Sequence, residues 1–148
     1  MRKKTNYVVN EEATQEDKVN EPSFAYPLNS PAIAQKGYSY QQFSMLAKQL
    51  PFSLKEWALL LHLSERTLQR YAQNNSAFEG IYKDKLLHIE ELFQTGISTF
   101  ATAEALVKWL KKDKTVFGQV LNFSSLQTSQ GIQSHIEEIG RIQMGVYI

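Results

Sequence analysis

The chain has 148 residues, of which 43% are hydrophobic and none is cysteine, so it can bury a core in one domain or two small ones but forms neither disulfides nor thiolate metal sites. The formal net charge of +1 is not that of a strong nucleic-acid binder, so DNA binding would require an oligomer in which weak contacts add. The sequence has neither an apolar run of membrane-spanning length nor a signal-peptide core, and we therefore expect a cytoplasmic protein with no membrane contact.

Residues 1–35 are predicted to form a flexible N-terminal arm. They are polar and mixed in charge, and prolines interrupt them at Pro22, Pro27 and Pro31. The basic residues Arg2 to Lys4 could touch a DNA backbone, although a solvated tail is the simpler interpretation.

The first predicted helix runs from Tyr38 to Leu50. Ser39 can cap its start, and Pro51 stops it because a proline disfavours helix in the residue before it. Its apolar face is predicted to consist of Phe43, Leu46, Ala47 and Leu50.

Two short helices joined by a tight corner follow in residues 53–74. The helical pattern breaks at His62, and Ser64 restarts it as an N-cap with Thr67 three residues later. The buried side is predicted to hold Leu54, Trp57, Ala58, Leu61, Leu68 and Tyr71. The small Ala58 lets two helices cross closely, and this arrangement is typical of a helix-turn-helix, although many such motifs have glycine where this chain has His62.

The outward face of the second short helix carries residue types that bond phosphates and base edges. Arg66 and Arg70 lie four residues apart and share a face, Gln69 could pair with adenine, and Glu65 could accept from cytosine or repel phosphates. The candidate DNA-binding residues are Ser64, Glu65, Arg66, Thr67, Gln69 and Arg70. The alternative is a surface helix of a packing module that does not contact DNA.

The C-terminal half is also predicted to be helical. Its predicted elements are a loop over residues 74–80, a helix from Asp84 to Phe93 terminated by Gly96, a helix from Thr102 to Lys112, an irregular piece holding a short turn at Leu126, and a final helix over residues 129–143 capped by Thr128. No stretch alternates with period two for long enough to demand a sheet, so the predicted fold class is all-α.

The ionisable residues show no catalytic or metal-binding pattern. His62, His88 and His135 are isolated from one another, and His135 is expected at the surface of the final helix near Glu138. There is no glycine-rich phosphate loop and no nucleophile with a base at a recognisable spacing. We therefore expect no metal site, no cofactor and no enzymatic activity.

An ordered set of short motifs in the C-terminal half resembles a known family. The matching pieces are Lys85-Leu86-Leu87, Phe100, Trp109-Leu110, Phe117-Gly118, Ser125-Leu126, Thr128, Gly131, Ile136 and the ending IGRIQMGVYI. Together with the preceding helix-turn-helix, the chain resembles the Xre/MbcA/ParS antitoxins over about residues 36–148. It departs from the family's pattern at His62 and in having Phe123-Ser124-Ser125 where the family has a proline after the glycine turn.

The resemblance implies that the two halves of the chain bind different partners. An Xre-like helix-turn-helix domain over residues 36–80 would bind operator DNA and repress the protein's own operon, and a small helical domain over residues 81–148 would bind a toxin and self-associate as a homodimer or higher oligomer. The partner implied is a bacterial RES-domain toxin that consumes NAD, so NAD would be a substrate of the toxin and not a ligand of this chain. The toxin-binding residues implied are Arg141, Met144, Gly145, Val146, Tyr147 and Ile148.

Other interpretations remain open from the sequence. The apolar ending could pack back on its own domain, with Ile142 in the core and only the last residues facing a partner. The chain could also be a stand-alone helix-turn-helix transcriptional regulator whose C-terminal domain serves only for dimerisation or effector sensing. A small enzyme is disfavoured, because no catalytic constellation is present.

Overall fold

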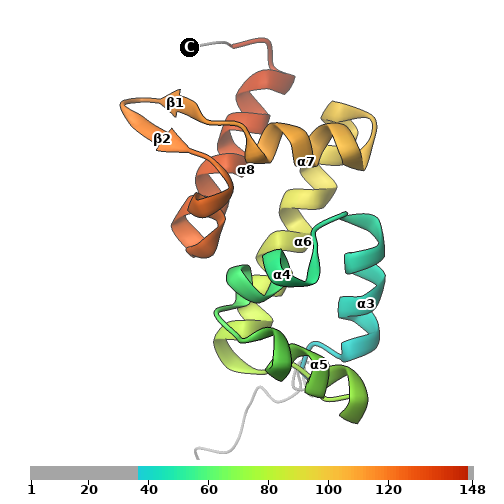
Figure 1. Cartoon of the computed structure of the whole chain (residues 1–148). Helices are drawn as coiled ribbons and strands as arrows, with labels where there is room; N and C mark the ends of the chain where they lie inside the picture. The colour runs from blue at the N-terminus through green and yellow to red at the C-terminus, as the bar shows by residue number, and fades with distance from the viewer. Residues whose placement is uncertain (1–36, 147–148) are drawn as a thin grey trace, which may run out of the picture. The chain divides into compact units, whose positions relative to one another are not determined.

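The computed structural model describes residues 37–146, which form six α-helices, one 3₁₀ helix and one β-hairpin (Figure 1). In chain order the elements are α3 (Tyr40–Gln49), α4 (Leu54–Leu61), α5 (Glu65–Asn74), α6 (Gly80–Phe100), α7 (Ala103–Lys111), β1 (Lys114–Val116), β2 (Gln119–Leu121), η1 (Phe123–Gln127) and α8 (Ser129–Gln143). The predicted all-α class is confirmed. The predicted arm over residues 1–35 lies outside the described residues, and the predicted domain boundary after residue 80 falls at the first turn of α6.

Helix α3 begins at the predicted cap Ser39, although Tyr38, which was predicted to lie in this helix, forms a backbone bridge instead, and α3 and α4 each have a reciprocal cap. The Ser39 hydroxyl accepts from the Gln42 amide at 3.0 Å while the Gln42 side chain accepts from the Ser39 amide at 2.8 Å. Each cap satisfies two of the amides that a helix start leaves without partners. Phe43 and Trp57 are buried between the two helices with ring centroids 5.1 Å apart, whereas Leu54, predicted to be buried, is 39% exposed. Leu54 is the first residue of α4, so little of the core reaches it.

A short backbone bridge closes the loop before α6. The Tyr38 amide donates to the Phe78 carbonyl at 2.9 Å, and the Phe78 amide donates to the Tyr38 carbonyl at 2.7 Å. The Phe78 ring is fully buried and stacks on Tyr71 of α5 at 4.6 Å. This bridge ties the segment before α3 to the segment that follows α5, and so holds the first three helices together.

Helix α6 is longer than the predicted Asp84–Phe93 at both ends: it begins at Gly80, and it passes through Gly96, which was predicted to end it. The helix continues to Phe100, and Gly96 is buried against Leu106 of α7. A β-carbon at Gly96 would lie only 2.6 Å from a methyl carbon of Leu106. Gly96 therefore allows α6 and α7 to pack closely and does not reverse the chain. The helix ends at Ala101, which has φ +70°.

The piece between α7 and α8, predicted to be irregular, contains an antiparallel hairpin. Lys114 pairs with Leu121 and Val116 with Gln119, and the connecting residues Phe117 and Gly118 have φ of +50° and +81°. Positive φ at both central residues is the geometry of a type I′ turn, which matches the twist of paired strands. The prediction was wrong here because strands of three residues are too short to reveal a period of two.

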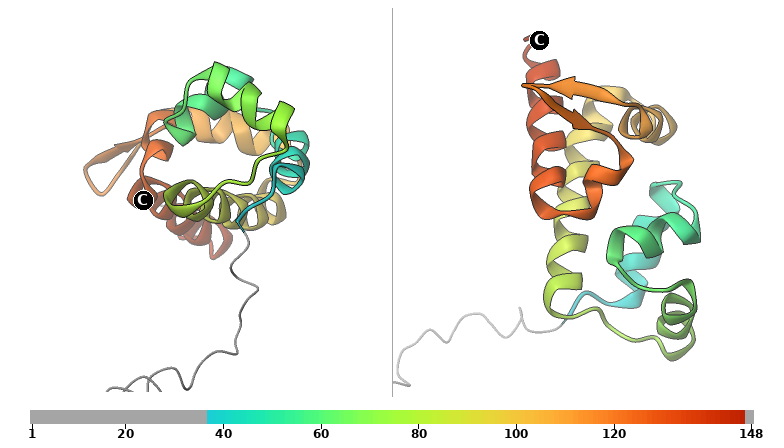
Figure 2. Two further views of the ribbon diagram at one scale, coloured as in Figure 1. Left: turned by 90° about the horizontal axis from the view of Figure 1, so that it is seen from below. Right: turned by 60° about the vertical axis from the view of Figure 1, so that its left-hand side comes forward.

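Helix α8 begins at the predicted cap, since the Thr128 hydroxyl accepts from the Gly131 amide at 3.0 Å. The helix packs along α6, as both views of Figure 2 show, and its Ile132 and Ile139 are fully buried. Within residues 37–146 no helix is long and apolar enough to cross a lipid bilayer.

Candidate functional site

Two surfaces predicted from the sequence can be located in the structure, and the first is built on the corner between α4 and α5. His62 adopts the left-handed conformation at φ 57° and ψ 39°, which ends α4, and the Leu63 amide then donates to the Ala58 carbonyl at 3.0 Å. Ala58 is buried, as a close helix crossing requires. Histidine therefore supplies the backbone reversal that glycine gives in many such corners.

The outward face of α5 is polar and open to solvent. Arg66, Gln69 and Arg70 are exposed, as are Ser64 and Glu65, whereas Thr67 is half-buried. The Ser64 hydroxyl accepts from the Thr67 amide at 3.0 Å and donates to the Thr67 hydroxyl at 2.9 Å, so both hydroxyls are engaged in the cap. Neither arginine takes part in the ion pairs found among residues 37–146, which leaves both guanidinium groups available for anionic partners.

The α4–α5 corner is attached to the C-terminal half at the Gln127 carbonyl. The His62 Nε2 donates to this oxygen at 3.0 Å, and the Lys85 ammonium on α6 donates to the same oxygen. Burial lowers the pKa of Lys85. Three segments (the corner, α6 and η1) thus meet at one backbone acceptor that closes η1.

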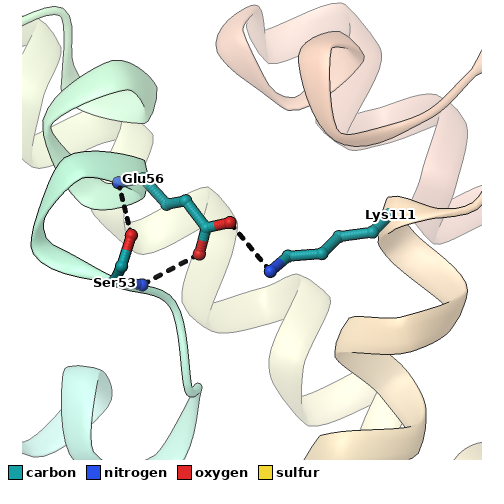
Figure 3. A network of polar contacts seen from close by, with 3 residues as sticks. All are labelled: Ser53, Glu56 and Lys111. Carbon is teal, nitrogen blue, oxygen red and sulfur yellow. Dashed lines mark hydrogen bonds and ion pairs between the residues drawn. The ribbon is translucent and has the colours of Figure 1, made fainter.

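A second attachment joins the start of α4 to the end of α7 (Figure 3). The Glu56 carboxylate accepts from the Ser53 amide at 2.9 Å and lies 2.8 Å from the Lys111 ammonium. Partial burial acts to raise the pKa of Glu56, but the hydrogen bonds from Lys111 and Ser53 and the Lys111 charge together hold it below its usual range. The cap of α4 is therefore also an ion-pair partner for the C-terminal half.

The second predicted surface lies at the C-terminal end of α8. The Gly145 amide donates to the Ile142 carbonyl at 3.0 Å, the Val146 amide donates to the Arg141 carbonyl at 2.8 Å, and Gly145 has φ +77°. These two bonds define a Schellman motif, which turns the chain away from the helix axis. Met144 is 78% exposed and Val146 is 49% exposed, while Tyr147 and Ile148 lie outside the described residues.

Arg141 is held in place by its own chain. Its Nε and Nη2 atoms both lie 2.8 Å from the Glu138 carboxylate, and its guanidinium carbon lies 4.7 Å from the centre of the Phe117 ring at the hairpin turn. The structure therefore brings together the predicted Arg141 and Phe117, a residue that the resemblance marked only as part of a turn.

His135 was predicted at the surface and is instead fully buried, so that prediction was wrong. Its Nδ1 donates to the Gly131 carbonyl at 3.0 Å, its ring meets the edge of Trp109 at 5.7 Å, and its Nε2 has no partner. Burial lowers its pKa to about 4. The signal was present in the sequence, because His135 is three residues after Ile132 and four before Ile139, on the same apolar face.

Lys114 is another residue whose role the sequence did not reveal. Its ammonium donates to the Trp109 carbonyl at 2.7 Å and the Lys112 carbonyl at 2.8 Å, and it lies 4.2 Å from the Trp109 ring centre. Burial lowers its pKa to about 8. These contacts satisfy carbonyls at the end of α7, so the lysine acts as a side-chain cap.

In the part of the chain that the structure describes, no group of three or more histidine and carboxylate side chains is placed to hold a metal ion. A scan against protein-family models and a search of curated proteins both find no match to this chain.

Proposed function

We propose that this chain is the antitoxin of a bacterial type II toxin–antitoxin system. It binds a cognate RES-type, NAD-consuming toxin through its C-terminal domain. The observation that carries the proposal is the end of α8, where a Schellman motif holds the apolar side chains of Met144 and Val146 exposed. Exposed apolar side chains at such a position favour a partner protein.

The proposed mechanism is steric occlusion, with no chemistry on this chain. The tail from Gly145 to Ile148 enters the cleft where the toxin binds NAD, with the apolar side chains filling its entrance. Arg141 stands at the base of the tail, and Glu138 holds its guanidinium in a fixed orientation. A pre-organised anchor of this kind loses less side-chain entropy on binding.

The outward face of α5 supports a second activity, repression of the operon that encodes the chain. Arg66 and Arg70 are exposed on one side of α5, where they can reach phosphates and base edges as α5 enters a major groove. The net charge of +1 limits the phosphate contacts that one copy can make. We therefore propose that a homodimer or higher oligomer binds the operator.

The proposed binding of a toxin is tested by co-expressing the chain with the neighbouring reading frame. The full chain should restore growth and cellular NAD, whereas a chain lacking Gly145 to Ile148 should fold normally by circular dichroism but give no protection. Full protection by the truncated chain would refute the role of the tail.

The proposed binding to operator DNA is tested separately with two double variants that remove the same charge. Arg66→Ala with Arg70→Ala should abolish the operator gel shift without changing the oligomer mass. Lys108→Ala with Lys112→Ala removes the same charge at the same spacing from exposed positions around the end of α7 and should retain the shift. Equal loss in both variants would show that only net charge matters.

The exposed arginines of α5 also favour an alternative, a stand-alone helix-turn-helix regulator. In that case the operator shift persists, but the adjacent reading frame neither arrests growth nor binds the chain. A pull-down after co-expression therefore discriminates between the two functions.

A further inference from the structure

An aromatic side chain stands at the tip of the β-hairpin in an unfavourable position. Phe117 is 71% exposed, so its ring gains little from burial, and its backbone lies in the left-handed region at φ +50°. Asparagine and glycine are the residues that favour this turn position. The left-handed backbone conformation and the exposure of the ring to water are both unfavourable for phenylalanine, so Phe117 is better explained by a function than by a contribution to stability.

The hairpin tip and the proposed toxin-binding tail form one continuous surface through Arg141. The guanidinium of Arg141 stacks on the Phe117 ring, and the Arg141 carbonyl accepts from the Val146 amide at the start of the tail. Val120 of β2 is also 58% exposed. Arg141 therefore links the start of the tail to the hairpin tip.

A hollow of about 250 Å³ lies between the hairpin and α8. It is lined by Val116, Phe117, Gln119, Leu121, Ser134, Glu137 and Arg141. Its volume is below the roughly 300 Å³ at which small-molecule sites begin, so it fits one inserted side chain better than a ligand.

The charge facing this hollow is negative. Arg141 is already neutralised by Glu138, whereas the exposed Glu137 carboxylate accepts from the Gln133 side-chain amide at 3.3 Å, which brings no positive charge. An inserted basic side chain would find a carboxylate and a side-chain amide there.

We propose that the hairpin tip and this hollow form a second contact with the toxin. Phe117 fills an apolar recess of the toxin, and a lysine or arginine of the toxin enters the hollow and pairs with Glu137. This inference rests on the proposed function. The toxin is chosen as the occupant because the surface is continuous with the tail through Arg141 and because its charge selects a basic partner group.

The test uses the purified full chain and a catalytically inactive form of the toxin, with affinity measured by calorimetry. Phe117→Asn removes the ring and places a residue that the turn prefers, so the variant should fold at least as stably while binding at least ten-fold more weakly. Glu137→Gln keeps the shape and removes the charge, and should bind about five-fold more weakly with a smaller dependence on salt. Ile81→Ala removes another exposed apolar side chain, on α6, and should bind like wild type.

Wild-type affinity of both Phe117→Asn and Glu137→Gln, with binding lost on deletion of Gly145 to Ile148, would overturn this inference and leave the proposed function intact. No binding by the full chain would instead overturn the proposed function. A changed oligomer mass of Phe117→Asn with unchanged toxin affinity would assign the surface to contacts between copies, and would also overturn the inference.

Discussion

Two glycines of α8 provide a matched pair of substitutions with opposite expected effects. A β-carbon at Gly131 would lie 1.7 Å from the Ser125 carbonyl oxygen, half the 3.4 Å at which ordinary contact begins. A β-carbon at Gly140 would meet no atom within 4 Å. Gly131→Ala and Gly140→Ala thus make the same chemical change in the same helix and differ only in surroundings.

The expected magnitudes follow from helix propensity and from overpacking. Alanine is favoured over glycine in a helix by about 1 kcal/mol, so Gly140→Ala should stabilise the protein by up to that amount. Gly131→Ala has the same advantage, but the contact it creates is with backbone, and overpacking costs about 1–3 kcal/mol even where side chains can adjust. Because η1 must separate from α8, we expect a net loss of roughly 3 kcal/mol.

Thermal unfolding followed by circular dichroism measures both effects. At about 4–8 °C per kcal/mol, Gly131→Ala should lower Tm by roughly 12–24 °C while Gly140→Ala raises it by a few degrees. A Gly131→Ala variant as stable as wild type would contradict the packing of η1 on α8. A Gly140→Ala variant that loses stability would contradict the open surroundings of Gly140.

Three further predictions concern the core and the attachment of the two halves. Between pH 6.5 and 4, His135 binds a proton in the unfolded chain but stays neutral in the folded chain. The free energy of unfolding that depends on neutral His135 is therefore fully present above pH 6.5 and falls as the pH drops toward 4, by up to about 3 kcal/mol. When the free energy of unfolding is measured by urea titration at several pH values across this range, His135→Leu should abolish this pH dependence. Gly96→Val should cost about 2 kcal/mol, and Leu106→Ala should cost about 2–5 kcal/mol because Leu106 is fully buried. The double variant should lose less than the sum of the two single losses, and simple additivity would contradict their contact. Glu56→Gln should cost only ~0.5 kcal/mol because Lys111 is 42% exposed, and a loss similar to that of Gly131→Ala would contradict this estimate.

Local signals in the sequence predicted several of the helix starts. Ser39, Ser64 and Thr128 all cap the helices they were expected to begin, because a cap depends on residues only three apart. Gly96 misled the prediction, because its purpose depends on Leu106 in the next helix. A sequence pattern does not show whether a glycine ends a helix or lies inside it where a side chain of another helix packs against it.

The candidate surfaces show the same limit. Exposure of Arg66 and Arg70 was predictable from the period of α5, since one amphipathic helix determines it. The stacking of Arg141 on Phe117 was not, because it depends on a hairpin whose strands have three residues each. Residues separated by more than twenty positions meet there only through tertiary packing.

His62 combines two requirements in one side chain. Glycine or asparagine would accept its left-handed backbone with less strain, but neither has a side chain long enough to take the place of the imidazole that reaches Gln127. A longer cationic residue could reach that carbonyl but would strain the corner. The position consequently admits very few replacements, and a substitution that improves one requirement worsens the other. Directed evolution of the corner should therefore recover histidine, or should change residue 62 together with the segment that holds Gln127.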